Sequence, residues 1–205
     1  MARRYIKYFI LFGLMMPSVS VSHAAELTSQ EDSIALIEGL SQDTIKILTS
    51  DVSQLDKESQ IRALLTENLD IERIGLLIAG KAIRKATAAQ KTQYKPAIRN
   101  YIEIKYSKLI GGYNGQSIEI LNTARAGKSD ALVNTQIIQE GSEPVTVSWR
   151  VSNKRKRLMV LDVIVEGISM LLTERQQFES VLQSKKFDGL IDTLEKKVTD
   201  MVAES

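Results

Sequence analysis

The part of this sequence that follows residue 24 contains neither cysteine nor histidine. The whole chain of 205 residues has no cysteine and a single histidine, His23. Histidine-based catalytic triads, thiol nucleophiles and ordinary zinc or copper sites are therefore excluded beyond that residue. No disulfide can form, so a hydrophobic core must hold the fold together. About 180 residues are enough to build such a core.

Long apolar runs are also missing, since no segment after the N-terminus reaches about 18 consecutive apolar residues. The N-terminus itself carries three basic residues, an apolar run over Tyr8–Met16 and small residues at Ser22-His23-Ala24. This pattern is typical of a secretory signal peptide, and its apolar run is too short to span a bilayer core of about 30 Å. We expect residues 1–24 to be removed and residues 25–205 to form one soluble domain outside the cytoplasm. An uncleaved membrane anchor is the alternative.

A strong net charge is absent once this leader is removed. The full chain carries 27 Lys and Arg against 25 Asp and Glu. The leader contains three basic residues, Arg3, Arg4 and Lys7, so 27 − 3 leaves 24 basic against 25 acidic side chains. A balance this close to neutral, in an exported chain without aromatic residues among its basic ones, argues against nucleic-acid binding.

Two short basic stretches stand out against this balance. Asn153–Arg157 lies between two expected strands, where a charged run is either a solvated turn or a contact for anionic headgroups or an acidic partner. Its candidate contact residues are Lys154, Arg155 and Lys156. A second stretch of the same kind contains Lys81, Arg84 and Lys85.

The hydrophobic period changes near the middle of the chain. Residues 28–109 follow a helical period, which the glycine-rich stretch Gly111–Gly115 interrupts. Beyond it the period falls to two, and short turns separate the segments, which favours an antiparallel meander. The expected strands are Ser117–Arg125, Ala131–Gln139, Pro144–Val151 and Leu158–Glu166. Two helical segments close the chain. We therefore predict an α+β fold in which a four-stranded twisted antiparallel sheet packs with about six helices.

The last expected strand, Leu158–Glu166, is apolar at both odd and even positions. Both of its faces must therefore be covered. The chain's own helices can cover one face, whereas the second cover is either more protein or an apolar ligand. Tyr101, Tyr106 and Trp149 could line a cavity for such a ligand or belong to an ordinary core.

Two carboxylates in this region, Asp162 and Glu166, do not form a catalytic pair. Four residues along a strand place them about 13 Å apart, whereas glycosidase carboxylates lie roughly 5 to 9.5 Å apart. Turn anchoring or pairing with Arg175 is the structural interpretation. The chain also has no G-x-S-x-G elbow and no S-x-x-K with its companion motifs. We expect no catalytic residues, no metal site and no cofactor.

The order of several motifs resembles the periplasmic phospholipid-binding MlaC family, also called the toluene-tolerance family. The matching pieces are Leu69-Asp70-Ile71 with Gly80, Tyr106 before a Gly-Tyr-x-Gly turn, Val133-x-Thr135, Pro144-Val145-x-Val147, Asp162-Val163-x-Val165-Glu166-Gly167-Ile168-Ser169, Arg175-x-x-Phe178 and Gly189-Leu190-Ile191-x-x-Leu194. Among the departures, the family often has an aromatic residue where Glu174 stands here.

This resemblance implies a periplasmic carrier that hides lipid tails in an apolar cavity between sheet and helices, and that maintains the lipid asymmetry of the outer membrane. The implied partners are phospholipid, an inner-membrane ABC transporter with a lipid-binding ring and an outer-membrane lipoprotein complex, with transient membrane contact by a monomer. The candidate lipid-binding residues, chosen by face, are Ile74, Leu77, Tyr101, Tyr106, Val147, Trp149, Val163 and Val165. Two alternatives stay open: a carrier of another amphiphile, such as a hopanoid or fatty acid, and an envelope adaptor that binds no lipid.

Overall fold

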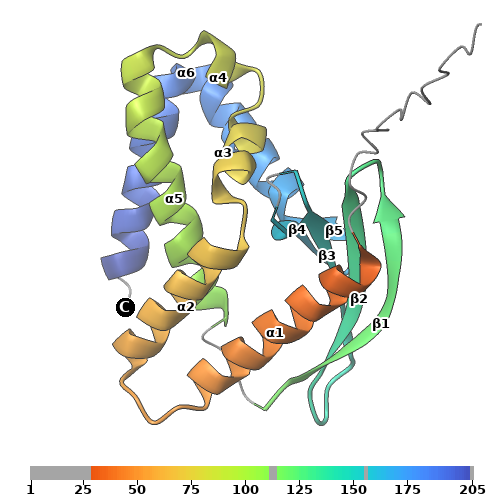
Figure 1. Ribbon diagram of the computed structural model, residues 1–205. Helices are drawn as coiled ribbons and strands as arrows, with labels where there is room; N and C mark the ends of the chain where they lie inside the picture. The colour runs from red at the N-terminus through yellow and green to blue at the C-terminus, as the bar shows by residue number, and fades with distance from the viewer. Residues whose placement is uncertain (1–28, 111–114, 155–156, 204–205) are drawn as a thin grey trace, which may run out of the picture.

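The computed structural model describes residues 29–110, 115–154 and 157–203. These residues form six helices and one antiparallel sheet (Figure 1). The predicted α+β class is confirmed, but the sheet has five strands instead of the four predicted. The expected leader at 1–24 and the candidate contacts Arg155 and Lys156 lie outside the described residues.

The first half of the described chain is helical, as its period predicts. Its helices are α1 (Gln30–Leu48), α2 (Gln54–Asn68), α3 (Ile71–Ala79), α4 (Ala82–Lys85) and α5 (Ala88–Ile110). Side-chain caps set three of the starts, because Ser29, Ser53 and Asp70 each accept a hydrogen bond from a backbone N–H three residues on. Helix α3 ends at Gly80, whose φ of 56° suits glycine.

The sheet is a meander in which each strand pairs with the next. Its strands are β1 (Ser117–Ala126), β2 (Asp130–Ile138), β3 (Val145–Ser152), β4 (Met159–Val165) and β5 (Ile168–Ser169), in that spatial order. The bounds of the first four agree with the predicted ones to one residue at each end. In the register, Val147 lies opposite Thr135 on one side and Val165 on the other.

The fifth strand, β5, follows a tight turn made by Glu166 and Gly167. Both have positive φ, 49° and 78°, which is the backbone of a two-residue hairpin turn. The Glu166 carboxylate also accepts a hydrogen bond from the backbone N–H of Thr146. A two-residue strand is too short to show a period of two, so the sequence predicted a turn directly into a helix at this point.

The helices cover one another and the sheet in two layers (Figure 1). Helix α1 packs against β1 and β2, whereas α3 and α6 (Met170–Ala203) pack against β4. Helix α5 packs against α2, α3 and α6. Two closing helices were predicted where α6 stands, and α6 does consist of two helical parts that meet at a kink at Lys186.

Candidate ligand-binding cavity

An apolar cavity of about 410 Å³ lies between the inner face of the sheet and the helices. Its wall contains side chains from α1, α2, α3, α5 and α6 together with strands β1 to β4. Cavities that hold small ligands typically measure about 300–1,000 Å³, are mostly apolar and contain a few polar groups. The size and chemistry of this space therefore fit an apolar ligand.

Six of the eight candidate lining residues face this cavity. They are Ile74, Tyr106, Val147, Trp149, Val163 and Val165. The four sheet residues form two cross-strand pairs, Val147 opposite Val165 and Trp149 opposite Val163. Alternate residues of a strand share a face, so both pairs point to the same side of the sheet. Contact between any of these residues and a lipid stays a prediction.

The other two candidates, Leu77 and Tyr101, lie outside the cavity wall. Leu77 is half-buried and packs against the core. Tyr101 is 2% exposed and donates a hydrogen bond of 2.8 Å to Glu174 Oε2. Five helical residues separate Tyr101 from Tyr106, which places the two side chains on different faces of α5. Only Tyr106 faces the cavity.

Much of the wall comes from helices that the sequence did not assign to the site. Helix α1 contributes Ile37 and Leu40, and α2 contributes Ile61 and Leu65. The apolar stripe along α1 marks a buried face, but the stripe alone does not say that this helix crosses β1 and β2. The sequence therefore indicated an amphipathic helix, but not the strands against which this helix packs.

The cavity wall is most exposed at one end of the sheet, which we take as its opening. There the wall residue Leu109 is 64% exposed, and its neighbours in the wall, Gln116, Ile118 and Ile137, are half-buried. We call these four residues the mouth. At the other end the wall is closed, since Ile78, Ile102, Val160 and Leu161 are at most 1% exposed.

The candidate contact residue Lys154 is exposed and lies at the closed end. It follows β3, whose last residue is Ser152, whereas the mouth adjoins the end of β2 and the start of β3 at Val145. Seven residues of extended strand separate Val145 from Ser152, which is about 23 Å. Lys154 is therefore far from the mouth.

Two carboxylates, Asp162 and Glu174, belong to the cavity wall, and both are satisfied. Asp162 accepts hydrogen bonds from the Ser169 hydroxyl at 2.6 Å and from the Leu171 backbone N–H at 3.0 Å. These bonds hold the start of α6 against β4, so the predicted turn anchoring is confirmed. Glu174 pairs with Lys105 and also accepts from Tyr101.

The phenol of Tyr106 stays protonated beside these carboxylates. Burial raises its pKa, and the negative charges of Glu174 and Asp162 raise it further. Burial likewise raises the pKa of Tyr101, with the neighbouring Glu174 adding to the effect. Both side chains can therefore donate hydrogen bonds, and neither supplies a phenolate nucleophile.

Neither a metal-binding cluster nor a membrane-spanning helix occurs in the described part of the chain. Residues 29–110, 115–154 and 157–203 contain no group of three histidine, cysteine or carboxylate side chains placed to bind a metal ion. Within the same ranges, no helix is both long and apolar enough to cross a bilayer.

Comparison with known proteins agrees with this geometry. A family model described as MlaC protein matches residues 38–196. A solved structure with a similar fold is that of the phospholipid-binding protein from Ralstonia solanacearum, in complex with a phospholipid, at 1.53 Å resolution. The TM-score is 0.72 at 18% sequence identity, and the match covers 82% of this chain and 97% of the other. This likeness shows a shared fold.

Proposed function

Because this chain belongs to the MlaC protein family, we propose that it binds and carries a phospholipid whose tails occupy the cavity. The observation that carries the proposal is the cavity wall, which is almost entirely apolar and open at one end. The similar Ralstonia solanacearum protein was solved with a phospholipid bound. A binding and transport role also agrees with a wall whose two carboxylates are held by structural hydrogen bonds.

In this proposal the tails enter the closed end and the headgroup stays at the mouth. The wall residues Ile78, Ile102, Val160 and Leu161 offer only apolar surface there. A phosphate in that environment would lose its hydration without a partner, which is costly. Since Lys154 lies at the closed end, we assign it to partner contact and not to the headgroup.

Release of the lipid into water is too slow for a carrier. Two acyl chains hold roughly 30 methylenes, and at about 0.8 kcal/mol each their exposure costs on the order of 20 kcal/mol. A bilayer or the apolar channel of another protein offers the tails an equivalent environment. We therefore propose transfer by direct handoff, with an inner-membrane ABC transporter and an outer-membrane lipoprotein complex as periplasmic partners. Maintenance of outer-membrane lipid asymmetry would be the result.

The first experiment asks what the purified protein contains. Protein prepared without detergent is extracted with organic solvent, and the extract is analysed by lipid mass spectrometry beside native mass spectrometry of the intact protein. We expect close to one phospholipid per protein molecule. A hopanoid or fatty acid in its place would identify a different amphiphile, and protein free of lipid would support the envelope adaptor.

The second experiment tests handoff. Protein loaded with a fluorescent phospholipid is mixed with acceptor vesicles over a range of vesicle concentrations, with and without reconstituted transporter. Handoff predicts a rate that rises with acceptor concentration and with the partner present. Rapid transfer at a rate independent of both would mean that the lipid dissociates into water, which contradicts the proposal.

A further inference from the structure

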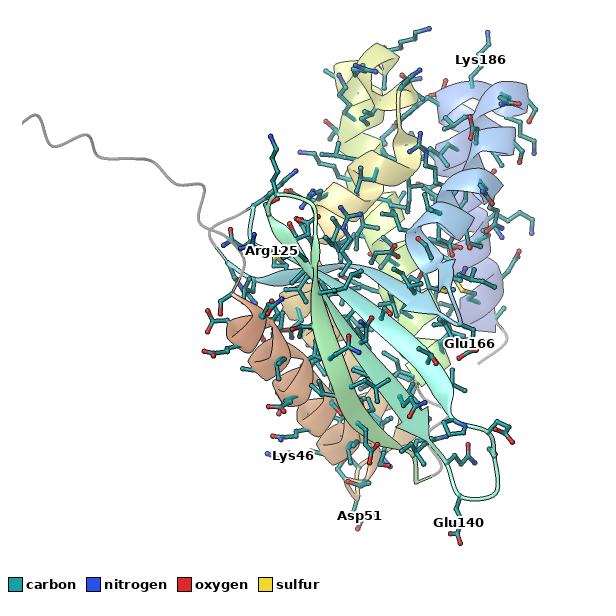
Figure 2. The ribbon with its side chains drawn as sticks, turned by 90° about the vertical axis from the view of Figure 1, so that its right-hand side faces the viewer. Lys46, Asp51, Arg125, Glu140, Glu166 and Lys186 are labelled. Carbon is teal, nitrogen blue, oxygen red and sulfur yellow. The ribbon has the colours of Figure 1, made fainter. Side chains whose placement is uncertain are left out.

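Helix α4, the start of α5 and the kink of α6 lie at the same end of the molecule (Figure 1), and six basic residues lie on or beside these segments. We call this set the basic tip, and it consists of Lys81, Arg84, Lys85, Lys91, Lys185 and Lys186. Five of the six are exposed, and Lys91 is half-buried. Figure 2 shows Lys186 projecting from the end of the molecule. The sequence alone marked only the first three, because the other three join them through the fold.

The basic tip concentrates positive charge, although the chain as a whole has similar numbers of basic and acidic residues. Residues 81–99 include six Lys and Arg and no Asp or Glu. Asp188, which follows the kink, accepts a hydrogen bond from the Gln90 side chain at 2.7 Å. No chain-wide excess of basic residues explains the cluster, since removal of the leader leaves slightly more acidic than basic residues.

None of the six cations of the basic tip takes part in an ion pair within the described part of the chain. Elsewhere, cations such as Lys105, Arg150 and Lys196 lie within 4 Å of a carboxylate. Like charges gathered in one place repel one another, and an external anion relieves that repulsion. The basic tip is therefore prepared for an anionic surface outside the chain.

The backbone at this end is held in a costly conformation. Lys186 has φ 59° and ψ −159°, a combination that glycine alone adopts readily. The following turn is close-packed, because a Cβ built on Gly189 would lie 2.2 Å from the Lys185 Cβ. This kink holds Lys185 and Lys186 at the apex, beside the cations of α4.

We propose that the basic tip binds the surface of a bilayer that contains anionic phospholipids. Five of the six cations are lysines, whose compact, strongly hydrated charges suit diffuse attraction better than paired docking geometry. Protein interfaces usually centre on buried aromatic or large apolar anchors. Across residues 81–91 and 183–188, no large hydrophobic side chain is exposed. A membrane needs no such anchor.

Binding through the basic tip would point the mouth away from the bilayer. Lys91 and Leu109 lie 18 residues apart on the same helix, which is about 27 Å. Exposed Asp51 and Glu140 lie toward the mouth end together with exposed Lys46 (Figure 2), so acidic and basic side chains are mixed at that end. The protein would be tethered while its cargo stays available to a protein partner. This inference stands whether or not the cavity carries lipid.

The test compares two triple charge reversals that change the net charge equally. K81E/R84E/K85E reverses half of the basic tip, and K46E/R125E/K128E reverses three exposed cations that lie outside it. Each protein is floated with vesicles of phosphatidylcholine alone and of phosphatidylcholine mixed with phosphatidylglycerol. Each basic side chain near an anionic membrane contributes on the order of fivefold to partition.

We expect the wild type and the K46E/R125E/K128E variant to bind only the phosphatidylglycerol vesicles. The K81E/R84E/K85E variant should lose more than about tenfold in partition. Binding should also be weaker at about 0.15 M salt, where the Debye length is about 8 Å, than at about 0.01 M salt, where it is about 30 Å. The milder K81Q/R84Q/K85Q variant should fall between, and circular dichroism checks folding. The proposal is overturned if the basic-tip variants partition like the wild type, if the K46E/R125E/K128E variant loses partition, or if the wild type does not bind.

Orientation has its own readout, because the chain has no cysteine to interfere with labelling. A fluorophore is attached to Ala89→Cys beside the basic tip or to Glu140→Cys toward the mouth, and a quencher is placed in the vesicle headgroups. The Ala89→Cys label should be quenched and the Glu140→Cys label should not. The opposite pattern would overturn the proposed orientation. Co-purified lipid in the K81E/R84E/K85E variant is measured separately, so a failure of tethering is not confused with a failure of cargo binding.

Discussion

The Tyr101 hydroxyl donates a 2.8 Å hydrogen bond to Glu174 Oε2 and so couples α5 to a carboxylate of α6 that belongs to the cavity wall. Lys105 pairs with the other carboxylate oxygen, and its Nζ lies 5.4 Å from the centre of the Tyr101 ring. Glu174 is only 3% exposed. The Glu174 carboxylate is therefore bound by the Tyr101 hydroxyl and the Lys105 ammonium, which lie about one turn apart on α5.

We expect Tyr101→Phe to lower the free energy of unfolding by about 1.5–3 kcal/mol, because a hydrogen bond to a charged acceptor is lost. Tyr94→Phe is the matched control. Tyr94 donates to the neutral carbonyl of Gly75 at 2.8 Å, and both rings make edge-to-face contacts with centroids 5.3 Å from a phenylalanine. Its loss should cost about 0.5–1.5 kcal/mol. Urea unfolding measures the free energy of unfolding of both variants. An equal or larger loss of this free energy in Tyr94→Phe would contradict the special role of Glu174.

Val147 and Val133 test whether the cavity is open space or packed core. Both are buried, at 2% and 0% exposure, and both point to the inner face of the sheet, but only Val147 belongs to the cavity wall. Val147→Glu should displace lipid and leave the fold intact, because water can reach the new carboxylate through the cavity. Val133→Glu buries an unpaired charge and should unfold the protein. Circular dichroism and lipid content are measured on the same samples.

Global unfolding of Val147→Glu to the extent seen in Val133→Glu would move Val147 from the cavity to the core. Retention of lipid by a folded Val147→Glu protein would show that the tails lie elsewhere.

The sheet could be predicted because its evidence is local. A change of period after Gly115 and alternation such as Val145, Val147, Trp149 and Val151 place strand bounds within a residue of the observed ones. Strand β5 could not be predicted in this way. It depends on Glu166 adopting a positive φ and on pairing with the end of β4, which no period of two records.

The cavity was only partly predictable, for a related reason. Alternation assigns Val147 and Trp149 to one face, whereas the rotation of a helix about its axis is set by its neighbours. Leu77 and Tyr101 share helices with the wall residues Ile74 and Tyr106, but the packing of α3 and α5 turns them away from the cavity. The pairing of Lys105 with Glu174 joins residues 69 positions apart and has no signature in either segment.

Asp130 should make stability depend on pH in the acid range. Burial alone would raise its pKa, but hydrogen bonds from Ser152 and Arg150 and the positive charges of Arg150 and Arg73 lower that pKa below its usual value. A carboxyl with a lowered folded-state pKa contributes stability that is fully present above its unfolded pKa, about 3.9. This contribution is lost as the pH falls through the folded-state pKa.

We therefore expect Asp130→Asn to cost about 1.5–3 kcal/mol at neutral pH, where the charged hydrogen bonds of 2.6 and 2.9 Å from Arg150 are lost. The difference between wild type and variant should shrink below about pH 4. Urea unfolding across this range measures it. A difference that stays constant down to pH 2 would mean that the carboxylate charge contributes nothing.

The kink of α6 predicts opposite effects for two glycine-to-alanine substitutions. In an ordinary helix, alanine is favoured over glycine by about 1 kcal/mol. Gly39 lies in α1 with nothing within 4 Å of its built Cβ, so Gly39→Ala should raise the free energy of unfolding by up to about that amount. At Gly189 the built Cβ lies 2.2 Å from the Lys185 Cβ, an atom fixed to the backbone.

Gly189→Ala should therefore be destabilising by about 1–3 kcal/mol, because the kink must open to admit the methyl group. Lys186→Gly should act in the opposite direction. It relieves a backbone strain of about 1–3 kcal/mol at the cost of about 0.5–1 kcal/mol in chain entropy. Thermal unfolding of the three variants gives the signs. If Gly189→Ala raised the midpoint as Gly39→Ala does, the close contact at the kink would not exist, and the constraint that presents Lys185 and Lys186 at the basic tip would be lost with it.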